Sequence, residues 1–169
     1  MFVGRKKELD ALNSRYKSNR KEFGVLYGRR RIGKSSILNE FLKGKKGILF
    51  QAKQDNSYGN LKSFSYEVDH LLNLPDTFVF ASWQHAFKSI QEYAKNERFV
   101  LIIDEYPYIV SQDSSFSSVL QEFIDHTSDN MMVILSGSDI GFLQKEIQNH
   151  ASPLYKRRTF EMEIKKMNF

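Results

Sequence analysis

Residues 28–35 read Gly-Arg-Arg-Arg-Ile-Gly-Lys-Ser, which fits the phosphate-loop pattern G-x-x-x-x-G-K-[ST]. Glycines in such a loop let backbone N–H groups close around phosphate oxygens, and the N-terminus of the following helix adds free donors and the positive end of its dipole. Lys34 would reach the outer phosphates, and the hydroxyl of Ser35 would ligate Mg²⁺. The stretch therefore predicts a nucleotide-binding loop. The residues expected to surround the phosphates are Gly28, Arg29, Arg30, Arg31, Ile32, Gly33, Lys34, Ser35 and Ser36.

The three consecutive arginines are an unusual feature of this loop. The backbone amides of Arg29, Arg30 and Arg31 can serve the phosphates whatever their side chains do. The guanidinium groups either point to solvent and neighbouring carboxylates, or contact phosphate, a neighbouring domain or nucleic acid. The sequence leaves both interpretations open.

A carboxylate pair, Asp104 and Glu105, ends the apolar run 99–103. Ligands of open α/β sheets sit at the carboxyl ends of the strands, so the pair fits a Walker B motif. Asp104 would hold Mg²⁺, and Glu105 would orient and deprotonate the attacking water, since phosphoryl transfer depends on positioning and charge neutralisation. The alternative is a pair of strand-end carboxylates that face solvent. Tyr106 and Tyr108 follow directly, and we expect them to pack in the core or at the surface, with stacking on a ligand as the alternative.

Both motifs require a sheet that brings strand ends together, and the chain alternates short apolar runs with amphipathic segments. The predicted strands are residues 23–27, 46–52, 99–105, 131–138 and 159–169, the last at an edge. One predicted helix follows the phosphate loop and stops at Gly44. Further helices are predicted over residues 60–74, 83–96, 114–129 (with Ser114 as candidate N-cap) and 140–149. The pattern predicts one α/β domain with a mainly parallel sheet.

The composition narrows the class of protein. With 169 residues, 41% of them hydrophobic, the chain can bury one core. The lack of cysteine excludes disulfides, zinc ribbons and thiol catalysis, and favours a cytoplasmic location. No apolar run approaches the roughly 18–20 residues of a membrane span, and the four histidines lack metal-ligand spacing. The net charge of +5 suits an anionic partner, either phosphate or nucleic acid.

Six stretches follow one another in an ordered set: FVGRKKELDAL, VLYGRRRIGKSSIL, SWQHAF, VLIIDEYPYI, ILSGSDIGFL and SPLYKRRT. This set resembles the prokaryotic, archaeal-type P-loop ATPases of the AAA+/STAND-related group over nearly the whole chain. The resemblance implies a three-layer α/β/α domain with a five-stranded core in the order 5-1-4-3-2. It also implies ATP and Mg²⁺ as ligands.

The same resemblance implies further site residues. Gly4 and Arg5 would lie near the adenine and ribose. Ser136 or Ser138 would occupy the sensor position, where a polar side chain detects the γ-phosphate, although a serine at a strand end also serves simply as a turn former.

Arg157 and Arg158 correspond to an arginine pair of the family, a candidate arginine finger or sensor that acts in cis or across an interface. The alternative is a solvated basic run. Lys156 stands where the family usually has glycine, which questions the conformation of this loop.

Members of this family normally continue into a helical lid and a winged-helix or nuclease-like region. The chain ends at Phe169, directly after the predicted last strand. We therefore expect residues 1–169 to form an ATPase core without lid and effector region. Such a core would bind ATP and turn it over slowly, because closure and water exclusion would be incomplete.

Three functions agree with these observations. The first is an ATPase that hydrolyses ATP to ADP and phosphate and thereby drives or gates an effector, either DNA or protein. The second is a nucleotide-regulated nucleic-acid-binding module, and the third is a nucleotide switch that does not hydrolyse. No membrane partner is expected, and an arginine acting across an interface would require a homo-oligomer.

Overall fold

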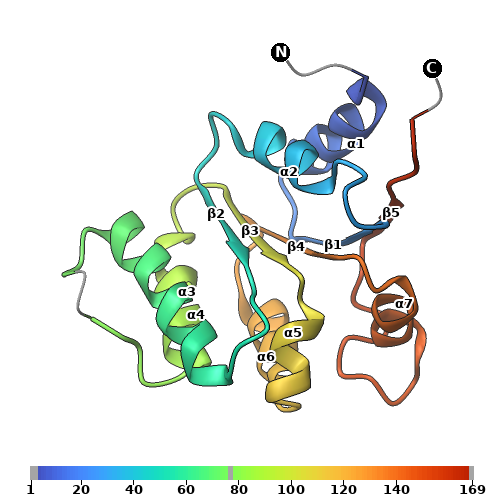
Figure 1. The fold of residues 1–169 in the computed structure, drawn as a ribbon. Coiled ribbons are helices and arrows are strands. Elements are labelled where there is room, and N and C mark those ends of the chain that lie inside the picture. The colour runs from blue at the N-terminus through green and yellow to red at the C-terminus, as the bar shows by residue number, and fades with distance from the viewer. Residues whose placement is uncertain (1–3, 76–77, 168–169) are drawn as a thin grey trace.

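A single parallel sheet forms the centre of the molecule in the computed structural model, which describes residues 4–75 and 78–167. Its strands are β1 (Glu22–Tyr27), β2 (Gly47–Gln51), β3 (Phe99–Asp104), β4 (Met131–Gly137) and β5 (Phe160–Glu163). Their spatial order is β2-β3-β4-β1-β5 (Figure 1). Read from the other edge, this is the expected 5-1-4-3-2 order, and all of the pairings are parallel.

The first four strand predictions are confirmed to within one residue at each end. The last strand was predicted over residues 159–169, but β5 has four residues. The reason is that its partner β1 ends at Tyr27, opposite Glu163, so no ladder continues beyond that pair. Residues 168 and 169 lie outside the described part of the chain. The edge position of β5 is confirmed, because it pairs with β1 alone.

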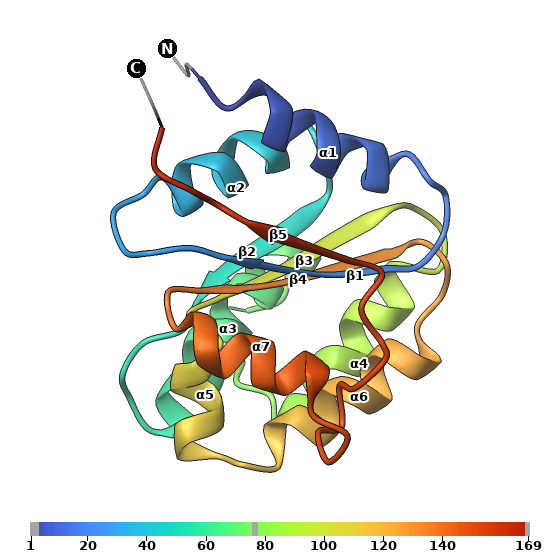
Figure 2. The same cartoon turned by 90° about the vertical axis from the view of Figure 1, so that its right-hand side faces the viewer.

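Helices cover both faces of the sheet and give the expected three layers (Figure 2). One face carries α1 (Lys6–Tyr16) and α2 (Lys34–Leu42); the other carries α3 (Ser57–Leu72), α4 (Trp83–Tyr93), α5 (Pro107–Gln112), α6 (Phe116–His126) and α7 (Ile140–Gln148). Alternate residues of β3 serve opposite faces, as the pleat requires. Val100 and Ile102 pack in the cluster that includes α1 and α2, whereas Leu101 and Ile103 pack against the other helices.

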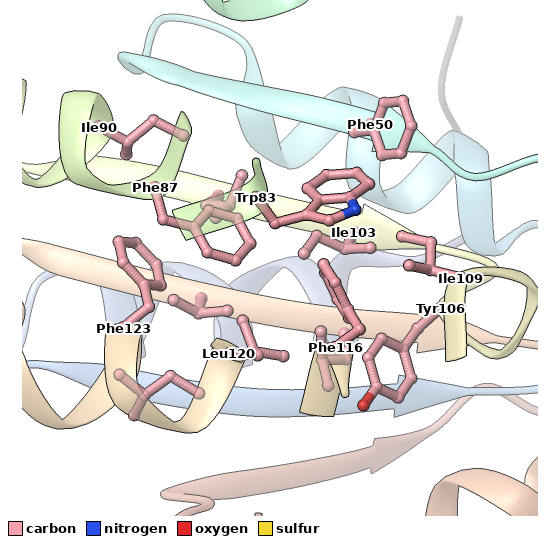
Figure 3. Close-up of a cluster of buried hydrophobic side chains, with 14 of the residues drawn as sticks. Phe50, Trp83, Phe87, Ile90, Ile103, Tyr106, Ile109, Phe116, Leu120 and Phe123 are labelled. Atoms are coloured by element: carbon pink, nitrogen blue, oxygen red, sulfur yellow. The ribbon is translucent and has the colours of Figure 1, made fainter. Parts of the chain in front are cut away.

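Aromatic side chains dominate the larger of the two cores (Figure 3). The rings of Trp83 and Phe116 meet edge to face with centroids 4.9 Å apart, and Phe87 stacks on Phe123 at 4.7 Å. Such pairs add about 0.5–1.5 kcal/mol each beyond the burial of their area. They join α4 to α6 on one face of the sheet. No helix in the described part of the chain is long and apolar enough to cross a membrane.

Helix boundaries differ from the predictions where local polar groups decide them. The helix predicted to start at residue 60 begins at Ser57, because the side chain of Asn56 caps it by accepting from the N–H of Gly59. Ser114 was predicted as the N-cap of the helix over residues 114–129, but it does not hold that position. Ser115 holds that position without a capping side chain, and Asp113 accepts from its N–H.

Two helices, α1 and α5, are absent from the sequence-based prediction. The charged residues of α1 mask an apolar face that includes Leu9, Leu12 and Tyr16 at helical spacing. α5 has six residues and begins with Pro107, the type of residue favoured at the first helical position. It is too short to show a periodicity. The helix stop predicted at Gly44 is confirmed, since α2 ends at Leu42 and Gly44 adopts a left-handed φ of 75°.

The contact between Gly24 and Phe160 holds β5 against β1. A Cβ atom added at Gly24 would lie 1.9 Å from the Phe160 ring, which stands on that glycine. Gly24 is also paired with Phe160 in the register of the two strands. The packing of β5 against β1 therefore requires a residue without a side chain at position 24.

We predict that Gly24→Ala lowers the free energy of unfolding by about 1–3 kcal/mol, the usual cost of overpacking a core. Urea denaturation measures this change. The control is Gly141→Ala, an exposed position in α7 where an added Cβ meets its nearest neighbour only at 3.9 Å. That variant should be neutral or more stable by up to about 1 kcal/mol, because alanine favours the helix. Equal stability of the two variants would contradict the packing argument.

Candidate nucleotide-binding site

The carboxyl ends of three central strands meet at one edge of the sheet. β1 ends at Tyr27 opposite Gly137 of β4, and Asp104 of β3 lies opposite Ser136 of β4. The loop 28–33 leaves this edge and enters α2 at Lys34. The predicted phosphate loop and the predicted carboxylate pair are therefore brought together, as the parallel topology requires.

The conformation of the loop depends on two residues with positive φ. Arg31 has φ 62° and Gly33 has φ 102°, a combination that turns successive N–H groups toward one point. Gly28 starts the loop in contact with the strand end of β5, since a Cβ there would lie 2.7 Å from the carbonyl oxygen of Ile164. Lys34 follows at the start of α2 and is 6% exposed. A cation held this close to a ring of backbone donors favours an anionic ligand.

Arg5 links the loop to the chain after β5. Its guanidinium donates to the carbonyl oxygens of Ile32 at 2.8 Å and Lys165 at 2.9 Å, and only 7% of the residue is exposed. Gly4 precedes it with φ 89° and packs against Met167. Of the two residues predicted for the adenine and ribose side, Arg5 thus contacts the phosphate loop and has a structural role there, and Gly4 packs against Met167.

A basic pocket of about 390 Å³ opens at the same place. It is lined by Arg5, Arg29, Arg30, Arg31, Ile32, Lys166 and Met167. Its charge suits the phosphates of a nucleotide, and the apolar side chains of Ile32 and Met167 suit a base.

Asp104 joins the strand ends through its two carboxylate oxygens. Oδ1 accepts from the hydroxyl of Ser136 at 2.7 Å and from the N–H of Glu105 at 3.0 Å. Oδ2 faces the hydroxyl of Ser35 at 3.4 Å. Asp104 is 3% exposed, so these bonds are needed to keep a carboxylate there.

The oxygens of Ser35 and Asp104 fit Mg²⁺, which prefers hard oxygen ligands and is usually bound by one or two carboxylates together with substrate phosphates. No cluster of three or more His, Cys, Asp or Glu suited to a metal occurs within residues 4–75 and 78–167. A metal ion here would therefore be held jointly by these two residues and a nucleotide. Ser36 lies next to Ser35 in the first turn of α2 and is exposed.

Glu105 adopts a left-handed backbone conformation with φ 55°. This conformation is uncommon for residues other than glycine, and it occurs often at functional sites. Its carboxylate lies 3.5 Å from the hydroxyl of Ser138. The next residue, Tyr106, is fully buried among the aromatic side chains of the core (Figure 3). The chain therefore turns sharply at Glu105 and leaves its carboxylate at the site.

The hydroxyl of Tyr106 fixes this turn from the other side. It lies 2.6 Å from the hydroxyl of Ser117 on α6 and donates to Glu146 on α7 at 2.8 Å. Burial, together with the charge of Glu146, raises the pKa of Tyr106 far above its usual value. The phenol consequently stays protonated and remains a donor. Tyr106 was predicted to pack in the core or at the surface, and it packs in the core. Its polar contacts come from residues distant in sequence.

Arg30 is the loop arginine with side-chain partners. Its Nη2 donates to the hydroxyl of Tyr108 at 2.9 Å, and its Nε lies 3.4 Å from the hydroxyl of Ser138. Arg29, Arg30 and Arg31 are all exposed. The sequence gives no signal for the contact with Tyr108, which lies 78 positions away along the chain.

A family model for an ATPase domain predominantly from Archaea matches residues 2–169. The chain belongs to this family. An uncharacterized protein of Methanocaldococcus jannaschii is 29% identical over 171 residues, which cover 100% of this chain and 37% of that protein. An uncharacterized ATP-binding protein of the same organism is 46% identical over 46 residues, 27% of this chain and 78% of that protein.

Solved structures share the fold of this archaeal-type ATPase domain. The Aeropyrum pernix Orc1 protein in complex with DNA matches with a TM-score of 0.73 and 13% identity, over 99% of this chain and 47% of that one. The Aeropyrum pernix ORC2 protein, solved as ADPNP–ADP complexes, matches with a TM-score of 0.68 and 16% identity, over 96% and 48%. The chain thus spans about half of these proteins or less. The family match identifies the chain as a nucleotide-binding ATPase domain, and the solved structures share its α/β fold.

Two predicted site residues of this ATPase domain, Arg157 and Arg158, are not brought to the phosphate loop. They precede β5, whose first residue pairs with Gly24 near the start of β1, whereas the loop follows the end of β1. Arg157 donates to both carboxylate oxygens of Asp125, at 2.9 and 3.0 Å. Arg158 pairs with Glu161 at 3.3 Å.

The arginine pair therefore lies toward the amino ends of the parallel strands, whereas the phosphate loop follows the carboxyl end of β1. Lys156, which stands where the family usually has glycine, adopts φ 62° and so meets the conformation that glycine would favour. The bidentate pair raises the pKa of Arg157, and hydrogen bonds from that guanidinium lower the pKa of Asp125.

We predict that Arg157→Ala lowers the free energy of unfolding by up to about 1 kcal/mol, since the pair is partly exposed and screened by solvent. Because the pKa of Asp125 is depressed in the folded state, this stabilisation is present above the carboxyl's unfolded value of about 3.9 and is lost as the pH falls through the folded value. Urea denaturation between pH 7 and pH 3.5 measures the difference from wild type, which should shrink only at the acidic end.

Arg20→Ala serves as the control, because it removes an exposed positive charge at the same end of the molecule. It should change stability by less than Arg157→Ala at pH 7. Unchanged stability of Arg157→Ala combined with slower phosphate release would contradict the structural role and indicate a nucleotide contact across an interface.

Proposed function

We propose that this domain hydrolyses ATP to ADP and phosphate in a Mg²⁺-dependent reaction that drives or gates an effector. The supporting observation is the cluster of Ser35, Asp104 and Ser136, which lies under the phosphate loop with Glu105 alongside. The chain spans only part of the length of its relatives. The existence of an effector is therefore itself part of this proposal.

The loop would hold the triphosphate through its backbone N–H groups, and Lys34 would bind the outer phosphates. Ser35 and Asp104 would hold Mg²⁺, which when bound neutralises phosphate charge. Gly4 and Arg5 would border the base and ribose in the basic pocket. Because Arg5 also donates to the carbonyl oxygen of Ile32, a ligand that moves Arg5 would also move the phosphate loop.

Glu105 would orient the attacking water and accept its proton. Proton transfer requires a base within hydrogen-bond reach of the nucleophile, and the left-handed turn at Glu105 leaves its carboxylate at the strand end for that purpose. Ser138 contacts this carboxylate and Ser136 contacts Asp104. Either serine would respond to a γ-phosphate by exchanging its present bond for one to the ligand, which is the chemistry of a sensor.

We predict that Glu105→Gln reduces the rate of phosphate release about 100-fold or more, because the amide cannot accept the proton. Its affinity for Mg·ATP should stay within about threefold of wild type, since the amide preserves shape and the phosphates are bound elsewhere. Single-turnover phosphate release and isothermal titration measure the two quantities.

Lys34→Ala is the matched variant for binding and should lose measurable ATP affinity. Equal phosphate release by wild type and Glu105→Gln would favour the non-hydrolysing nucleotide switch instead. Undiminished ATP affinity of Lys34→Ala would contradict the loop assignment itself.

DNA is a second candidate for the effector. The side chains of Arg29 and Arg31 are exposed beside Lys166 in the basic pocket, and the similar Orc1 protein was solved in complex with DNA. If DNA is the effector, duplex DNA should raise the rate of phosphate release. Its binding should weaken by about 10³-fold or more between 50 and 200 mM salt if six or more phosphates are contacted. Turnover that does not respond to DNA at low salt would leave a protein effector.

A further inference from the structure

The Arg30 guanidinium bridges the phosphate loop to the segment that follows the carboxylate pair. Its Nη2 donates to the Tyr108 hydroxyl at 2.9 Å, and its Nε lies 3.4 Å from the Ser138 hydroxyl. Ser138 is in turn 3.5 Å from the Glu105 carboxylate. The Ser138 hydroxyl therefore lies between the Arg30 guanidinium and the carboxylate of Glu105, the proposed general base.

Phosphoryl transfer is accelerated by positive charge placed close to the transferred group. Negative charge develops on the transferred group and the leaving oxygen, and an arginine aimed at it accelerates many ATPases and GTPases. In this domain Arg157 is bound to Asp125 at the other edge of the sheet. Arg5 is committed to two backbone carbonyl oxygens. The Arg30 guanidinium, by contrast, contacts two side chains close to Glu105, those of Tyr108 and Ser138.

We propose that Arg30 is the arginine that stabilises the transferred γ-phosphoryl group in cis, and that Tyr108 is its positioning residue. The proposal rests on ATP hydrolysis at this site. It assigns the catalytic guanidinium to the phosphate loop of the same chain rather than to the region of residues 157–158 or to a neighbouring subunit.

Tyr108 is suited to this role because its own position is fixed. It lies in α5, between Pro107, which begins the helix, and Ile109, which is fully buried. An exposed arginine otherwise samples many rotamers. A hydrogen bond to a hydroxyl on a packed helix restricts Arg30 to the side of the loop that faces Glu105, and preorganisation of this kind is what electrostatic catalysis requires.

The test compares Arg30→Ala and Tyr108→Phe with wild type, using Mg·ATP, Mg·ADP and Mg·ADP with aluminium fluoride. Arg30→Ala should lower kcat about 100-fold, the usual loss of one preorganised donor at developing charge. Affinity for ADP should stay within about twofold, whereas affinity for ADP with aluminium fluoride should fall about tenfold or more, because only the latter imitates the transferred group. Tyr108→Phe should lower kcat about tenfold with little change in KM, since it misplaces the charge without removing it.

A double-mutant cycle separates positioning from independent effects. If Tyr108 acts through Arg30, then Arg30→Ala combined with Tyr108→Phe is no slower than Arg30→Ala alone. Two controls account for nonspecific changes. Tyr66→Phe removes an exposed hydroxyl from α3, and Arg20→Ala removes an exposed guanidinium from the opposite end of the molecule. Both should keep the wild-type kcat.

The outcomes distinguish this inference from the proposed function. Wild-type protein that releases no phosphate defeats the proposed hydrolysis, and this inference with it. A hydrolysing wild type whose kcat is unchanged in Arg30→Ala overturns the role of Arg30 while hydrolysis stands. Additive losses in the double variant overturn the positioning role of Tyr108 alone.

Discussion

A carboxylate that is almost completely buried must be hydrogen-bonded, and Asp104 has hydrogen-bond partners from separate elements of the fold. The Ser136 hydroxyl donates to it from β4, and the backbone N–H of the adjacent residue Glu105 donates to it as well. The Ser35 hydroxyl approaches it from α2. Those bonds fix the ends of β3 and β4 relative to the phosphate loop. The need to stabilise one charge thus sets the geometry of the whole site, and an ion bound by the free lone pairs would use positions that are already defined.

The second constraint acts on the neighbouring residue, Glu105. A left-handed backbone at a residue other than glycine costs on the order of 1 kcal/mol or more. Burial of the Tyr106 ring contributes about 1.5–3 kcal/mol and offsets that cost. The Tyr106 hydroxyl is hydrogen-bonded to Ser117 of α6 and to Glu146 of α7. The strained turn is thus connected to two helices on one face of the sheet. A single side chain therefore holds the turn and both helices together.

The sequence was sufficient for the features that local pattern determines. The loop, the buried strands and the carboxylates at the end of β3 follow from residue type and periodicity, and parallel topology brings them together. Long-range polar contacts leave no such pattern. Arg5 bonds to the backbone of Lys165, 160 positions away, and a backbone acceptor has no signature in side-chain identity. Arg157 reads as a basic run whether it is solvated, paired or catalytic, and only the position of Asp125, 32 residues earlier, decides.

The fold also divides the positive charge in a way that the net value of +5 does not reveal. Arg98 donates to backbone carbonyl oxygens, and Arg157 donates to the Asp125 carboxylate as well as to the carbonyl oxygens of Pro153 and Tyr155. Arg29 and Arg31 form no ion pair within the described part of the chain, and they share one pocket with other cations. Like charges gathered there repel one another until an anion lies between them. A compact polyanion such as a triphosphate satisfies that arrangement.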